Sequence, residues 1–143
     1  MTEPYRPLIR SQAALEEVWR HLIRPLGFHR RSLWLLLIGP DDLPTPLMTE
    51  ITDLPDTPDS ATTDGLGQLL AHFVSGDEPE GRWAVLLSRP GAHPTDDLDR
   101  GWAAALYDAF RRSGIAHEMV HLATDTDIRP IPFDEVTGYV QAS

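Results

Sequence analysis

The chain of 143 residues contains no cysteine, and all 12 of its lysine-plus-arginine residues are arginines. The absence of cysteine excludes disulfides, thiolate nucleophiles and cysteine-ligated zinc. The absence of lysine excludes Schiff-base chemistry and the lysine of a phosphate-binding P-loop. Arginine without lysine, together with many alanines, prolines and aspartates, indicates a GC-rich bacterial genome and says nothing of function.

Long hydrophobic runs are also missing. The longest, Leu33 to Ile38, has the length of a strand, whereas a bilayer span needs roughly 20 apolar residues. The first residues, MTEPYRPLIR, lack the apolar core of a secretory signal. We therefore expect no membrane partner and a cytoplasmic location.

Acidic residues outnumber basic ones, and the net charge is −10. Residues 1–31 hold six arginines against three acids (+3), so residues 32–143 hold six arginines against nineteen acids (−13). An acidic body repels a phosphate backbone, so we expect no nucleic-acid partner. The basic segment, with Arg24, Arg30 and Arg31, is expected to lie against this acidic body; a small basic patch formed by these three arginines is the alternative.

The periodicity of apolar residues predicts three helices and several buried strands. Helices are expected from the N-cap Ser11 to about Ile23, from Leu66 to about Ser75, and from Asp96 to a C-terminal stop at Gly114. Strands are expected at residues 32–38, 47–52, 83–87 and 128–131, and residues 53–64 form a loop. The prediction is a single-domain α/β sandwich (residues 11–143) after an N-terminal extension (residues 1–10). Its mixed sheet has about five strands. The expected core is Leu15, Trp19, Leu35, Leu37, Leu70, Phe73, Val85, Leu87, Trp102, Leu106 and Phe110.

The stretch AHEMVH contains His117, Glu118 and His121 in the H-E-x-x-H pattern of zinc peptidases. That chemistry needs both histidines one turn apart on a helix, with the glutamate polarising a zinc-bound water. Here Ser113-Gly114 ends the preceding helix and Thr124 to Asp127 is turn material, so residues 115–122 are predicted to be a strand. His117, Met119 and His121 would then share one face and point away from Glu118. We expect no bound metal; a site at His117, Glu118 and His121 is the alternative.

A second candidate lies in the loop SRPGAHPTDD. Arg89 opens it, and His93 stands near Asp96, Asp97 and Asp99 at the start of a helix. The histidine and the carboxylates could hold a divalent metal, but acids at a helix start are also an ordinary response to the helix dipole. We expect Arg89 to be partly exposed. An ion pair with one of the three aspartates would contribute about 0.2–1 kcal/mol.

The element order is shared with zinc-dependent nucleoside deaminases, but those enzymes need cysteine ligands, which this chain lacks. The segments WLLLIGPDD, RWAVLLSRPGAHPTDDLDR and RRSGIAHEMVHLA resemble the JAB/MPN metalloprotease-like domain, especially its RadC branch, over roughly residues 33–131. The resemblance places the family's metal-ligand positions on Leu87 and Arg89, its aspartate on Asp99 and its catalytic glutamate on Glu50.

Leucine and arginine do not ligate zinc, so the resemblance implies a dismantled metal site. It favours a non-catalytic protein-binding or scaffold module that binds a protein partner or itself and needs no cofactor. The alternative is a metal-dependent hydrolase that uses either the H-E-x-x-H motif or His93 with its aspartates.

Overall fold

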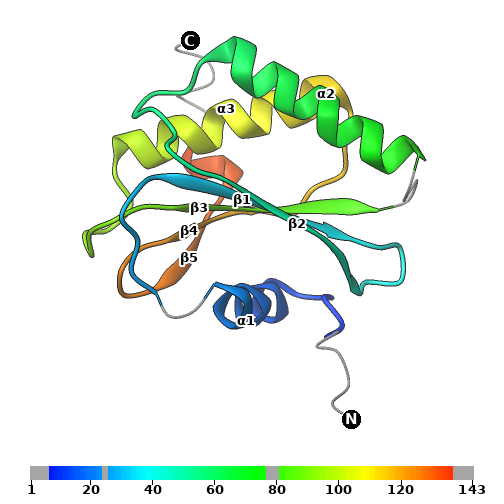
Figure 1. Ribbon diagram of the computed structural model, residues 1–143, viewed down its shortest axis with the longest axis horizontal. Helices are drawn as coiled ribbons and strands as arrows, with labels where there is room; N and C mark the ends of the chain where they lie inside the picture. Colours follow the sequence, from blue (N-terminus) through cyan, green and yellow to red (C-terminus); the bar gives the residue numbers. More distant parts are fainter. Residues whose placement is uncertain (1–6, 24–25, 77–80, 137–143) are drawn as a thin grey trace.

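The computed structural model describes residues 7–23, 26–76 and 81–136. Five strands form one sheet, and three helices and a short 3-10 turn complete the fold (Figure 1). In chain order the elements are α1 (Gln12–Leu22), β1 (Ser32–Ile38), β2 (Pro44–Ile51), α2 (Ser60–Gly76), β3 (Arg82–Ser88), α3 (Asp97–Ser113), β4 (Val120–Ala123), β5 (Ile128–Ile131) and η1 (Phe133–Glu135).

The sheet has the strand order β2-β1-β3-β4-β5. Strand β1 is antiparallel to both β2 and β3, β3 is parallel to β4, and β4 is antiparallel to β5. The parallel pair is joined through α3, as a crossover connection requires. The predicted α/β fold, with three main helices and a mixed sheet of about five strands, is confirmed.

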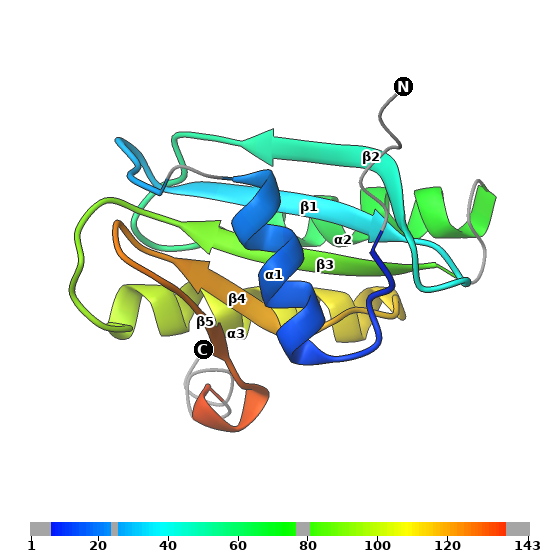
Figure 2. The same cartoon turned by 90° about the horizontal axis from the view of Figure 1, so that it is seen from below.

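The helices cover the two faces of the sheet unequally. Helices α2 and α3 lie together on one face, whereas α1 alone crosses the other (Figures 1 and 2). Alternate residues of β1 therefore join two separate cores. Leu33, Leu35 and Leu37 pack in the cluster under α2 and α3, and Leu36 and Ile38 pack in the cluster under α1.

The predicted core is buried wherever its side chains are described. The side chain of Phe73 lies outside the described residues. Residues 7–10, part of the expected N-terminal extension, form no helix or strand, but Ile9 is buried against the cluster under α1. This segment therefore contributes to the packing of the domain.

Strand β2 and helix α2 both begin earlier in the chain than predicted. Strand β2 begins at Pro44, although the prolines at 44 and 46 suggested a turn. Proline is tolerated at an edge strand because the outer side needs no ladder hydrogen bond. Helix α2 begins at Ser60, within the expected loop, because the carboxylate of Asp59 accepts hydrogen bonds from the Ala61 amide (3.3 Å) and the Thr62 hydroxyl (3.0 Å).

The ends of α3 follow the sequence signals closely. The Asp96 carboxylate accepts from the Asp99 amide, and the Asp99 carboxylate accepts from the Asp96 amide, which forms a reciprocal capping box. Gly114 closes the helix in the left-handed region at φ 68°. After β5 the chain forms the short 3-10 turn η1 at Phe133–Glu135. None of the helices in the described ranges combines the length and apolarity needed to cross a bilayer.

Candidate functional site

Arg89 follows β3 and reaches the N-terminus of α3. Its Nε lies 2.9 Å from Asp99 Oδ1, and its Nη2 donates to Asp99 Oδ2 at 2.8 Å. The same guanidinium donates to the carbonyl oxygens of His93 (3.0 Å) and Pro94 (3.2 Å). The side chain thus fastens the loop 90–95 to the helix that follows it.

The expectation that Arg89 is partly exposed is wrong. Arg89 is 2% exposed and Asp99 is fully buried. Asp99 also accepts from Arg31 Nη1 at 2.9 Å, so two guanidiniums meet one carboxylate. Burial raises the pKa of Asp99, but hydrogen bonds from Arg89, the Asp96 amide and Arg31 outweigh burial, and the pKa falls below 3.8. Asp99 therefore stays ionised and is fully engaged by its donors.

The basic segment pairs with the acidic body, as predicted, at the two described arginines of the expected trio. Arg31 binds Asp99, and Arg30 Nη1 lies 2.9 Å from Asp53 Oδ2. Arg24 lies outside the described residues.

His93 and the three aspartates do not converge on one point. The His93 ring is more than half exposed, and its Nδ1 lies 3.8 Å from Asp96 Oδ2. Asp97 points into solvent beside Arg100, and Asp99 is held by Arg89. Arg89 Nη1 lies 3.2 Å from His93 Nε2, and because a guanidinium can only donate, Nε2 accepts this hydrogen bond. The loop is therefore organised by Arg89 and Asp99.

Residues 115–122 were predicted to form a strand, and only the last part of the stretch does so. His117 forms an isolated parallel bridge with Trp83, and β4 begins at Val120. The Glu118 amide donates to the Trp83 carbonyl at 2.8 Å. The helix on which a zinc peptidase places its two histidines is not formed here.

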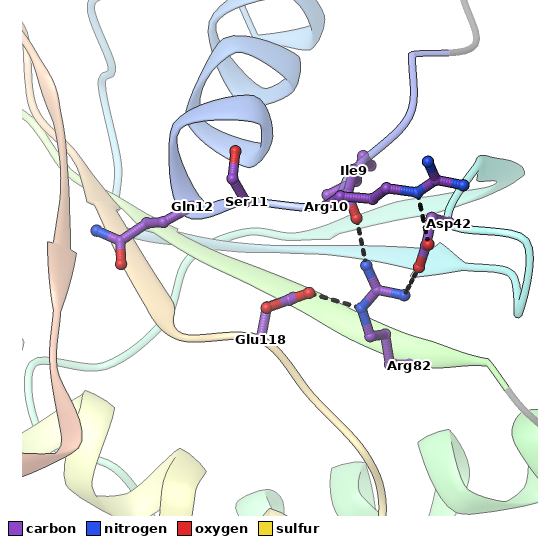
Figure 3. Close-up of a pocket in the computed structure, with 7 residues that line it drawn as sticks. All are labelled: Ile9, Arg10, Ser11, Gln12, Asp42, Arg82 and Glu118. Carbon is purple, nitrogen blue, oxygen red and sulfur yellow. Dashed lines mark hydrogen bonds and ion pairs between the residues drawn. The ribbon is translucent and has the colours of Figure 1, made fainter.

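The predicted facing of the histidines is wrong for His117. Its ring packs 5.1 Å from the Phe110 ring of α3, whereas His121 Nε2 lies 3.4 Å from Glu16 Oε2 of α1. The two histidines lie on opposite sides of the sheet because the chain between the bridge at 117 and β4 is not a regular strand. Glu118 points away from His117, as expected, toward Arg82 on the α1 side (Figure 3). Within the described ranges, no group of three His, Cys, Asp or Glu side chains could hold a metal ion.

His121 is a buried titratable group beneath α1. Its Nδ1 lies 3.0 Å from the Met119 carbonyl, which can only accept, so Nδ1 carries the proton. Its Nε2 has no hydrogen-bond partner among the described residues. Burial lowers the pKa of His121 below 6.5, although the Met119 carbonyl and Glu16 act in the opposite direction. The ring is therefore neutral at neutral pH.

The other positions implied by the resemblance lie apart. Leu87 is fully buried in the cluster under α2 and α3, the same side of the sheet as Asp99. Glu50 is paired in register with Trp34, which packs against the cluster under α1. Cross-strand partners project to the same face, so Glu50 is separated from Arg89 and Asp99 by the sheet.

A charged cluster that the sequence did not suggest lies at the N-terminal end of α1 (Figure 3). Arg82 Nε donates to Glu118 Oε1 (2.6 Å), Nη1 to Asp42 Oδ1 (2.9 Å) and Nη2 to the Ile9 carbonyl (2.6 Å). Arg10 Nε reaches the second oxygen of Asp42 at 3.1 Å. Hydrogen bonds from Arg10 and Arg82 lower the pKa of Asp42.

This cluster borders a hollow of about 300 Å³. Its two arginines, Arg10 and Arg82, are balanced by its two acids, Asp42 and Glu118, so no charge is left over for a ligand. It serves as a bracket that ties residues 9 and 10 to the β1–β2 turn and to β3. Its members come from four distant segments, so only the topology could have revealed it.

A larger hollow, of about 460 Å³, lies at the other end of the hairpin. Phe28, Arg30, Glu50 and Thr52 are among its lining residues, with Gly27, His29 and Ser32. The Ser32 hydroxyl donates to the Thr52 hydroxyl at 3.0 Å. This hollow joins an aromatic ring, the Glu50 carboxylate and hydroxyl groups beside the edge strand β2, together with Arg30, whose guanidinium is paired with Asp53.

A scan against protein-family models, a search of curated proteins and a search of solved structures each find no match to this chain.

Proposed function

We propose that this chain is a non-catalytic protein-binding or scaffold module of JAB-like shape. The observation that carries the proposal is the buried ion pair between Arg89 and Asp99. In the resemblance, Arg89 occupies a metal-ligand position and Asp99 the position of the family's aspartate. A fixed guanidinium repels a metal cation, and it already uses the oxygens that a cation would need.

The remaining side chains support the same proposal. Leu87 offers no ligand atom, and Glu50 lies across the sheet from Asp99. In this proposal the domain keeps the element order that the resemblance implies, while the positions that the family uses to hold a metal no longer do so. The partner is a protein or a second copy, and the cytoplasmic location expected from the sequence belongs to the same proposal.

The test is metal analysis of the full chain purified without a histidine tag. We expect far less than stoichiometric zinc in the parent chain, in the double variant His117→Ala, His121→Ala and in the control His72→Ala. Stoichiometric zinc that disappears in the double variant but persists in the control would overturn the proposal in favour of a metal-dependent hydrolase. Stoichiometric zinc that disappears in the variant His93→Ala would also overturn the proposal, in favour of a metal site in the loop 90–95.

A further inference from the structure

The two edges of the sheet differ in how well they are protected. Edge strands expose unpaired backbone N–H and C=O groups, and proteins commonly blunt them with proline or charge. Strand β5 is four residues long and carries Pro130 within it. Strand β2 has prolines at positions 44 and 46, but the five residues from Leu47 to Ile51 contain none.

The proline-free part of β2 is open to a further strand. In the part of the chain that the structure describes, β2 pairs only with β1 and ends the sheet (Figure 2). Thr49, Glu50 and Ile51 are all exposed, and Ile51 is 39% exposed despite its apolar side chain. Helix α1 crosses the middle of its face of the sheet and leaves β2 uncovered there (Figure 2).

The surroundings of this edge are acidic. Glu50 and the following Asp53, Asp56 and Asp59 are exposed. Of these, Asp53 is neutralised by Arg30, whereas Glu50 has no ion-pair partner within the described ranges. The field at the C-terminal end of β2 therefore favours a cationic partner.

The 460 Å³ hollow adds a place for one side chain of such a partner. A strand added to β2 would project alternate side chains onto the face that carries Glu50 and Thr52. A long cationic side chain there reaches the Glu50 carboxylate and the ring of Phe28, which suits an ion pair combined with a cation–π contact.

We propose that the outer edge of β2 binds an extended segment of a partner protein as an additional strand, with an arginine or lysine of that segment placed between Glu50 and Phe28. This inference rests on the proposed binding function and names the partner's chemistry. Backbone pairing supplies affinity, and the hollow with the Glu50 carboxylate supplies specificity, as in other cases of strand addition.

A second copy of the chain suits this edge less well. Its β2 segment, PTPLMTEI, contains no arginine or lysine that could lie between Glu50 and Phe28. Two β2 strands paired with one another would therefore give neither Glu50 carboxylate a cationic partner from the facing strand.

The experiment uses the isotope-labelled full chain and a short peptide of alternating threonine and valine with a central arginine. The same peptide with glutamate in place of arginine is the matched probe. Amide chemical shifts locate the binding surface, and fluorescence anisotropy gives the affinity. We expect the arginine peptide to shift the amides of residues 47–51 and the glutamate peptide to leave them unchanged.

The variant Glu50→Arg should weaken binding of the arginine peptide by at least about tenfold, because a charge-assisted contact becomes a repulsion. The control Glu135→Arg makes the same charge change on exposed η1, beyond the opposite edge of the sheet, and should alter affinity by less than about twofold. If Glu50→Arg fails to fold by its amide spectrum, Glu50→Gln takes its place, with a smaller loss expected.

Absence of binding at millimolar peptide, shifts that map away from β2, or equal affinity for both peptides would each overturn the inference. A concentration-dependent dimer that Glu50→Arg dissociates would also overturn it, because the occupant would then be a second copy. These outcomes leave the zinc measurement untouched, so failure of this inference is distinguishable from failure of the proposed function.

Discussion

Replacing Arg89 with alanine removes one partner of a buried ion pair. The guanidinium is 3% exposed as a side chain, and it contacts both oxygens of Asp99, which is fully buried. The substitution also leaves the carbonyl oxygens of His93 and Pro94 without that donor. In the parent chain burial raises the pKa of Asp99 and the hydrogen bond from Arg89 is the first of those that lower it, so the substitution leaves burial opposed only by the Asp96 amide and Arg31.

The expected loss in the free energy of unfolding depends on the hydrogen bonds that Asp99 retains in the variant. Breaking a buried ion pair by removing one partner costs about 3–5 kcal/mol, chiefly because a charge is left buried. Asp99 keeps its hydrogen bonds from Arg31 and from the Asp96 amide, which reduces that penalty. We therefore expect Arg89→Ala to lower the free energy of unfolding by about 3 kcal/mol, the low end of that range.

The assay is urea unfolding at pH 7, with the free energy of unfolding extrapolated to water. The control is Arg100→Ala, which removes an arginine from a pair with Asp97 whose carboxylate is 84% exposed. That loss should be about 0–1 kcal/mol. Arg89→Lys should recover only part of the stability, because an ammonium cannot reproduce the planar fork of donors.

A loss below about 1 kcal/mol for Arg89→Ala, or one equal to that of Arg100→Ala, would refute the reasoning. It would mean that the guanidinium is solvated in solution and that the loop 90–95 is not fastened to α3. Asp99 would then also be open to a metal cation, which contradicts the proposed function.

Two further predictions concern α1 and the contact between α2 and α3. Because burial lowers the pKa of His121 below 6.5, the unfolded chain binds more protons there. Its contribution to stability should be complete above about pH 6.5 and lost as the pH falls, and His121→Gln should flatten that slope in urea unfolding between pH 7 and 5. In α2, a Cβ on Gly67 would lie 2.5 Å from Ser113 Oγ and 3.1 Å from the Ala109 carbonyl, whereas one on Gly65 would meet nothing. In thermal unfolding, Gly65→Ala should stabilise by about 0.5–1 kcal/mol and Gly67→Ala should destabilise; a gain at both positions would contradict the close approach.

The types of the main elements were predictable from local chemistry. The run Ser32–Ile38 is too short for a free-standing helix and too apolar for a loop, and it forms β1 with those bounds. Helix α3 carries its own start and stop, the aspartates of its first turn and Gly114. Such signals act within a few residues, so they do not depend on how the rest of the chain folds.

Boundaries that depend on sheet position were harder to predict. The prolines of β2 argue for a turn unless the strand lies at an edge, and edge position is a property of the sheet. The start of α2 was missed because Asp59 was assigned to a loop, although it accepts hydrogen bonds from the first turn of the helix.

By itself, the sequence determined the element types, the three helices, the predominantly apolar strands and the absence of cysteine and lysine chemistry. It also indicated that one of three aspartates would pair with Arg89. Only the tertiary structure decided that this pair is buried. Arg31 comes from before β1 and Asp99 comes from α3, and burial depends on the fold bringing these two segments together around Arg89. The tertiary structure likewise placed His117 and His121 on opposite faces. A strand keeps its period of two only while its hydrogen-bond ladder continues, and the ladder between residues 117 and 120 is interrupted.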